Sequence, residues 1–137
     1  MNDLGLFRYV VYQDAKWDWR SFDVGRDSAL AEERAGFLNA KNPDLSAFKA
    51  RGGKLILYHG WNDGGSGGSI SPLTTLDYYD SVLARMGPDQ SDWLRLYMVP
   101  GMAHCGYGPA PDNFDLIGAL ERWHESGTNP DDWMRRE

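Results

Sequence analysis

The fold of this chain is decided by one stretch, Gly53-Lys-Leu-Ile-Leu-Tyr-His-Gly-Trp-Asn-Asp63. Its centre, Leu55–Tyr58, is a short and continuous apolar run, which is typical of a strand buried on both faces, as in a parallel sheet. A second apolar run, Leu94–Val99, predicts another buried strand, and Pro100-Gly101 ends it. The chain is therefore expected to contribute two strands to one parallel sheet.

The segment between the two runs predicts a helix. Ser71 fits the N-cap, Pro72 the first helical position and Gly87 the C-terminal stop. A strand, a helix and a strand at this spacing form a βαβ unit, whose strands are parallel and whose crossover is right-handed. Both strands then end at the same edge of the sheet.

Two chemically active side chains follow the predicted strands at nearly the same offset, Asp63 after the first and His104 after the second. Neighbouring strands lie ~4.8 Å apart, so we expect this carboxylate and this imidazole to reach each other. A lone Asp after a strand is usually a turn former and a lone His is usually structural, but matched offsets in one βαβ unit favour a functional pair. An imidazole can take the proton of a Ser hydroxyl during attack, while a carboxylate fixes its tautomer and stabilises the imidazolium.

Other candidate side chains have weaker support. Trp61 could line an acyl or alcohol pocket, or it could only shield the pair from water, and both interpretations stay open. His59, at the end of the first strand, is interpreted as a hydrogen-bonded structural residue, and His124 as a solvated residue of the last helix. The three His and one Cys show none of the usual ligand spacings, so neither a metal nor another cofactor is expected.

Several motifs carry a resemblance to a known family. Lys54–Asp63, Ser71–Gly87 and Val99–Gly106, together with Trp17–Arg20 and Asn42–Ser46, resemble the tannase and feruloyl esterase family of α/β-hydrolases. The resemblance covers almost the whole chain. It implies the C-terminal βαβα part of an α/β-hydrolase parallel sheet, preceded by a helical and loop segment that resembles the end of a lid. By this resemblance, residues 1–47 are the lid-like connecting segment and residues 48–137 belong to the core.

The same resemblance assigns roles to individual residues. It implies that Asp63 is the acid and His104 the base of a Ser–Asp–His triad, and that Cys105 is half of a disulfide to a Cys beside the nucleophile. The nucleophile, its Cys and the first strands of the sheet have no counterpart in this sequence, so the chain alone is expected to be inactive. The implied parent reaction is hydrolysis of an ester between a phenolic acid and a sugar or alcohol. The implied location is secreted or periplasmic.

A glycine-rich loop, Gly64-Gly-Ser-Gly-Gly-Ser69, allows two further interpretations. Gly64–Gly68 matches G-x-S-x-G, but Ser66 follows the Asp and does not lie at a sharp strand-to-helix turn, so the match is interpreted as accidental. Such a loop can also bind phosphate through backbone N–H groups, although no phosphate-loop motif is present. A non-catalytic βαβ binding or remnant module is the other alternative to an esterase.

The N-terminal third and the last helix are predicted from shorter signals. Leu4–Tyr12 is apolar enough for either a strand or a helix, and Asp27 fits the N-cap of a helix over Ser28–Asn39. A short helix is expected after Asp44. The last helix is expected over about Asn113–Ser126. Its predicted N-cap is Asp112, and its predicted apolar stripe is Phe114, Ile117, Leu120 and Trp123. Three aromatic side chains, Trp17, Trp19 and Phe22, are expected to form a small cluster under a loop, or by resemblance to face the substrate.

Composition limits the possible partners. The chain has 137 residues, 42% of them apolar, and a formal net charge of −6, which argues against a nucleic-acid or anionic-membrane partner. No apolar run approaches the ~20 residues that span a bilayer, and no signal peptide is visible. A single Cys favours a reducing compartment on composition alone, in contrast to the resemblance. Two strands leave open sheet edges, so we expect either a homo-oligomer or association with a missing N-terminal half of the hydrolase.

Overall fold

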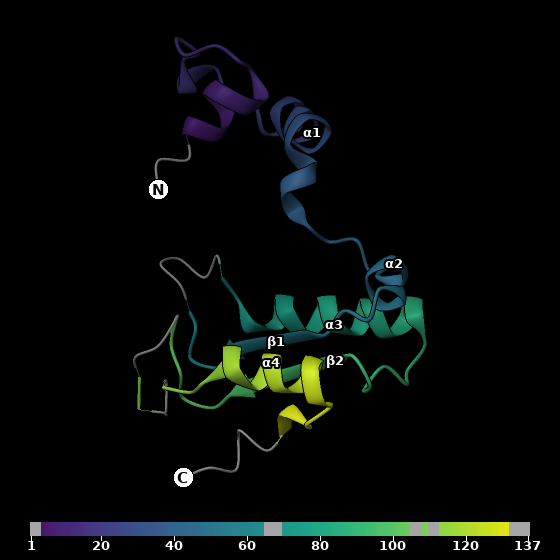
Figure 1. Ribbon diagram of the computed structural model, residues 1–137. Coiled ribbons are helices and arrows are strands. Elements are labelled where there is room, and N and C mark those ends of the chain that lie inside the picture. The colour runs from purple at the N-terminus through teal and green to yellow at the C-terminus, as the bar shows by residue number, and fades with distance from the viewer. Residues whose placement is uncertain (1–3, 65–69, 105–107, 110–112, 132–137) are drawn as a thin grey trace. The chain divides into compact units, whose positions relative to one another are not determined.

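The computed structural model describes residues 4–64, 70–104, 108–109 and 113–131 (Figure 1). The chain divides into two compact units, Met1–Lys41 and Asn42–Glu137, and each is described by itself. The helices of the first unit are η1 (Leu6–Val11), η2 (Trp19–Ser21), α1 (Val24–Ala35) and η3 (Gly36–Asn39). The second unit contains α2 (Ser46–Ala50), β1 (Leu55–Gly60), α3 (Pro72–Met86), β2 (Leu94–Val99) and α4 (Leu116–Ser126).

The first unit is built around an aromatic cluster. Its first segment, for which the sequence allowed strand or helix, is the π-helix η1. Phe7 on this helix stacks on Trp17 with ring centroids 5.4 Å apart and meets Phe22 edge-on at 5.1 Å. Tyr12 stacks on Trp17 at 5.1 Å. Trp19 is 52% exposed and lies under the Arg20 guanidinium, so the predicted cluster forms around Trp17 and Phe22.

The predicted N-cap of α1 is wrong. The helix begins at Val24, and the Asp23 side chain accepts a hydrogen bond from the Arg26 N–H at 2.8 Å, which makes Asp23 the N-cap. Asp27 is instead fully buried. Its carboxylate accepts hydrogen bonds from the Tyr12 hydroxyl and the Arg26 guanidinium, each at 2.5 Å, and from the Asp23 N–H at 2.9 Å. These donors, Arg26 foremost, hold the pKa of Asp27 well below its usual range.

This buried carboxylate predicts that the first unit loses stability in acid. Because the folded pKa of Asp27 lies below the unfolded value of ~3.9, its contribution is present above that value and is lost as pH falls through the folded pKa. We expect Asp27→Asn to destabilise this unit at neutral pH and to flatten its acid dependence. The Trp17 indole resonance in NMR spectra reports the unit during a pH titration. Asp14→Asn, at an exposed position, is the control, and superimposable acid profiles for wild type and Asp27→Asn would contradict the prediction.

The second unit contains the predicted βαβ arrangement. β1 and β2 pair in parallel, with the register running from Leu55 opposite Leu94 to Gly60 opposite Val99. The connecting helix α3 has Ser71 as its N-cap, Pro72 at its start and Gly87, at φ 96°, as its C-cap. The prediction of an α/β fold is therefore confirmed.

The two longer helices of this unit cover opposite faces of the strand pair (Figure 1). Side chains alternate along a strand, so Leu55, Leu57 and Leu94 share one face, where they pack with Val82 of α3. Lys54 and Arg95 belong to the other face and lie over the Trp123 ring of α4 at 5.1 and 5.4 Å. Each face of the strand pair thus packs against a helix, but β1 is less buried than its continuous apolar sequence predicted, since Leu55–His59 are only partly buried and Tyr58 is 46% exposed.

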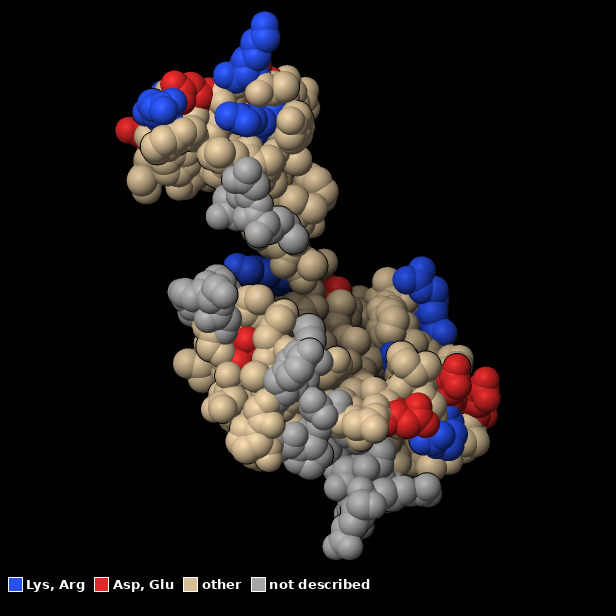
Figure 2. Space-filling view, turned by 90° about the vertical axis from the view of Figure 1, so that its left-hand side faces the viewer, with Lys and Arg blue, Asp and Glu red and all other residues tan. Residues whose placement is uncertain are grey.

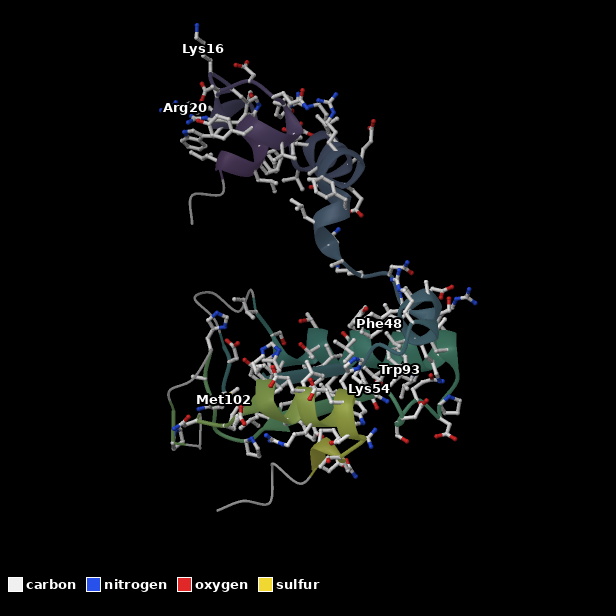
Figure 3. All side chains as sticks on the ribbon, viewed as in Figure 1. Lys16, Arg20, Phe48, Lys54, Trp93 and Met102 are labelled. Carbon is white, nitrogen blue, oxygen red and sulfur yellow. The ribbon has the colours of Figure 1, made fainter. Side chains whose placement is uncertain are left out.

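The core of the second unit is centred on Trp93, which is 2% exposed. Figure 3 shows Phe48 of α2 close to Trp93, and their ring centroids lie 6.0 Å apart. The Trp93 indole N–H donates to the Gln90 side-chain oxygen at 2.7 Å, which satisfies the polar atom inside the core. This packing anchors the start of β2 at the end of the sheet away from the candidate site.

The last helix begins later than expected. α4 starts at Leu116, and Asp115 caps it by accepting from the Gly118 N–H at 2.9 Å, whereas the predicted cap Asp112 lies outside the described residues. Ile117, which was placed on the apolar stripe, is 68% exposed, and Ala119 is buried together with Trp123. The predicted apolar stripe is therefore confirmed at Trp123 and wrong at Ile117, because the buried face runs through Ala119 and Trp123, which are four residues apart on one side of the helix.

Two further features bear on partners. No helix in the described ranges is long and apolar enough to cross a bilayer. Within those ranges β1 and β2 pair only with each other, so each strand keeps an open edge. Association with another copy or with further sequence remains a prediction.

Candidate active site

The candidate site lies where β1 and β2 end. Figure 2 views the molecule from the side on which the loops after both strands lie, and uncharged side chains make up most of the visible surface of this unit. Two backbone hydrogen bonds join the loops, from the Trp61 N–H to the Val99 carbonyl at 2.9 Å and from the Asn62 N–H to the Met102 carbonyl at 3.0 Å. Met102 is almost fully buried, and Figure 3 shows it at this end of the unit.

Gly60 allows this close approach. A Cβ atom at Gly60 would lie 2.7 Å from the Met102 carbonyl carbon and would overlap its oxygen. The absence of a side chain therefore lets the loop after β2 lie against the end of β1. This contact brings the residues that follow each strand into one place.

Asp63 and His104 are hydrogen bonded. His104 Nδ1 lies 2.9 Å from Asp63 Oδ2, the carboxylate is 4% exposed, and the imidazole is about half exposed. The proximity that the strand offsets predicted is therefore present. A buried carboxylate on Nδ1 orients the ring and stabilises its protonated form, while Nε2 is the atom that can exchange a proton with a reacting group. The catalytic roles of the two residues remain predictions.

A second imidazole reaches the same carboxylate oxygen. His59 Nε2 lies 3.0 Å from Asp63 Oδ2, and His59 Nδ1 lies 2.7 Å from the Thr75 hydroxyl of α3. The interpretation of His59 as a hydrogen-bonded residue fits these contacts, but it missed the link to Asp63. Two signals in the sequence could have found it. His59 precedes Asp63 by four residues, and strand alternation places it on the face that α3 covers.

A hollow of about 220 Å³ opens beside the pair. Apolar atoms form most of its wall, and both histidines and Asp63 belong to its lining. Its lining residues are Tyr58, His59, Gly60, Asp63, Ile70, Met102, Ala103 and His104. Trp61 is not among them and is 45% exposed, so its proposed part in a pocket or shield stays a prediction.

Several predicted features fall outside the described residues. These are Cys105 with its implied disulfide, and Ser66 with most of the glycine-rich loop considered for phosphate. His124 is exposed on α4, as expected for a solvated residue. In the part of the chain that the structure describes, no group of three or more His, Cys, Asp or Glu side chains is arranged to hold a metal ion.

Comparison with known proteins gives the family. A sequence model described as tannase and feruloyl esterase matches residues 3–137. The chain belongs to the tannase and feruloyl esterase family. The resemblance carried by the motifs around Asp63 and His104 is therefore confirmed at the level of the family.

Individual members of the tannase and feruloyl esterase family agree with this assignment. The chain is 47% identical over 92 residues to the mono(2-hydroxyethyl) terephthalate hydrolase of Piscinibacter sakaiensis, a match that covers 67% of this chain and 14% of that protein. It is 34% identical over 142 residues to a probable feruloyl esterase B-1 of Aspergillus terreus, which covers 91% of this chain and 26% of that protein.

A solved esterase structure shows the same fold. The crystal structure of an esterase from Aspergillus oryzae superposes with a TM-score of 0.74 at 30% identity, over 93% of this chain and 28% of that one. The chain thus spans about a quarter or less of the length of these relatives.

Proposed function

We propose that this chain supplies the acid and the base of a Ser–Asp–His triad in a carboxylic-ester hydrolase, and that the serine lies on sequence outside it. The observation that carries the proposal is the hydrogen bond between buried Asp63 Oδ2 and His104 Nδ1 at the edge where both strands end. Sites of open α/β sheets gather at this edge. Family membership supports an esterase reaction for such a pair.

The chemistry assigns one role to each residue. His104 Nε2 accepts the serine proton as the hydroxyl attacks the ester carbonyl, and the imidazolium then protonates the leaving alcohol. In the second half, His104 takes a proton from water as the water oxygen attacks the acyl-serine carbonyl. The imidazolium then returns this proton to the serine oxygen as the acyl–oxygen bond breaks and the acid is released. Asp63 stays ionised throughout and stabilises the imidazolium formed in each half.

A phenolic acid ester is the proposed substrate. The relatives are named for feruloyl esters and for mono(2-hydroxyethyl) terephthalate, both of which carry an aromatic acyl group. The hollow beside His104 has a largely apolar wall, which suits an aromatic ring. In the same proposal, Trp61 contributes to the acyl or alcohol pocket, Cys105 forms a disulfide with a Cys outside the chain, and the protein is secreted.

A chimera tests the proposal. The matched segment of the Aspergillus terreus feruloyl esterase would be replaced by this chain, and hydrolysis of methyl ferulate would be measured. We expect the chimera to hydrolyse the ester and His104→Ala to remove most of this activity, with His124→Ala as the matched control. A folded chimera without activity would count against the proposal.

The chain by itself provides a second measurement. Triad residues act as a unit, so without the serine we expect the chain to hydrolyse methyl ferulate no faster than a protein control of similar size. Turnover by the chain alone that Ser66→Ala abolishes would show that the nucleophile lies in the glycine-rich loop instead.

A further inference from the structure

A second imidazole, that of His59, reaches the candidate site. His59 is 13% exposed and lies between two partners, Thr75 of α3 and the Asp63 carboxylate. The catalytic pair needs only Asp63 and His104, so the role of His59 is not explained by the triad. His59 lies between the Thr75 hydroxyl and the Asp63 oxygen to which His104 also binds.

The partners of His59 define which ring nitrogen carries the hydrogen in its neutral form. An ionised carboxylate only accepts hydrogen bonds, so the Nε2 atom that lies 3.0 Å from Asp63 Oδ2 must carry a proton. A neutral imidazole then has a lone pair on Nδ1, and the Thr75 hydroxyl, 2.7 Å away, can donate to it. The contacts therefore favour the Nε2–H tautomer of the neutral ring.

We propose that Thr75 and His59 form a neutral buttress that positions the Asp63 carboxylate for His104. The chain of hydrogen bonds runs from the Thr75 hydroxyl to His59 Nδ1, and from His59 Nε2–H to Asp63 Oδ2. The same oxygen accepts the His104 Nδ1–H at 2.9 Å. His59 is thus a positioning residue, which acts on the reaction through Asp63.

In this proposal, the lack of a positive charge on the donor beside Asp63 preserves the effect of the Asp63 carboxylate on His104. A Lys or Arg in this place would fix Asp63 equally well, but its charge would offset the negative charge that His104 needs when it becomes an imidazolium. A neutral N–H donor orients the oxygen and leaves that charge intact. The Thr75 hydroxyl comes from α3. The helix that joins β1 to β2 therefore also fixes the side-chain rotamer of Asp63, which follows β1.

The catalytic meaning of the buttress rests on the proposed function, but its geometry is tested separately. Long-range proton–nitrogen correlation spectra of the full chain at alkaline pH report which nitrogen of each neutral histidine carries the proton. We expect hydrogen on Nε2 of His59 and on Nδ1 of His104. We expect Thr75→Val to leave His59 as a mixture of tautomers and to shift the His104 Nδ1–H resonance.

Matched variants separate positioning from folding. Thr74→Val removes the neighbouring hydroxyl, which bonds the Ser71 carbonyl, and should leave both histidines unchanged. Thr75→Ser keeps a hydroxyl and should restore the wild-type spectrum. In the chimera, Thr75→Val should lower kcat roughly tenfold with little change in KM, since one hydrogen bond to the buttress is lost.

The outcomes distinguish the two proposals. Hydrogen on Nδ1 of His59 in the wild type, or a Thr75→Val spectrum in which both histidines are unchanged, would overturn the buttress. If Thr75→Val does not fold, the wild-type tautomers and the Thr75→Ser spectrum still decide. An inactive chimera combined with the expected tautomers would refute the esterase proposal and leave the buttress standing as a structural device.

Discussion

Asp63→Asn in the chimera is expected to lower kcat/KM for methyl ferulate by about 10⁴-fold. The amide oxygen can still accept the His104 Nδ1–H, so the geometry can survive the substitution. The negative charge is lost, however, and the imidazolium that forms during attack is no longer stabilised. The loss should appear mainly in kcat, because Asp63 is almost fully buried and acts on the ester only through His104 in the proposed mechanism.

The control for this experiment lies on the same unit. Asp80→Asn changes an exposed carboxylate of α3 by the same single group and should leave kcat/KM unchanged. Thermal unfolding of both variants shows whether the fold is intact. Activity within tenfold of the wild type in a folded Asp63→Asn variant would remove Asp63 from the triad.

Gly60→Ala is expected to have the second largest effect, because it separates the two halves of the site. The new methyl group would overlap the Met102 carbonyl and lie 3.0 Å from the Ala103 oxygen, both of which are backbone atoms. Overpacking of this kind costs about 1–3 kcal/mol of unfolding free energy. The loop that carries His104 must then move away from β1, and a displacement of about 1 Å can lower the rate 100-fold.

Urea unfolding of the chain and kinetics of the chimera measure these two consequences. Gly64→Ala is the matched control, since a methyl group there meets nothing within 4 Å and the residue follows Asp63 directly. Equal stability for wild type and Gly60→Ala would mean that the loop after β2 can move away from Gly60 without loss. The predicted role of the close contact would then be wrong.

Much of the second unit could be predicted from its sequence because local signals there agree with the tertiary structure. The two apolar runs are continuous since a helix packs on each face of the strand pair, and Ser71, Pro72 and Gly87 mark the helix between them. The proximity of Asp63 and His104 follows from parallel strands that end together. These features depend on spacing and on residue type, which a sequence displays directly.

The errors arise where a distant partner decides between equivalent local choices. Asp23 and Asp27 both fit an N-cap, and Asp23 is the residue that caps α1. The Asp27 side chain is instead buried, where it accepts a hydrogen bond from the Tyr12 hydroxyl. His59 is similar, since its link to Asp63 becomes evident only when Thr75 of α3 is placed against the strand. A pattern along the chain contains no information on such contacts until the elements are assembled.

The parallel pairing of β1 with β2 has a consequence for the order of folding. Leu55 meets Leu94 only after the whole of α3 and both of its connections have closed into a loop, and closure of a long loop carries an entropy cost before any strand contact forms. Asp63 and His104 follow these strands directly. Asp63 is therefore expected to meet His104 late, after the crossover has docked. A chain in which α3 has formed but the strands are unpaired would have helical structure without this pair.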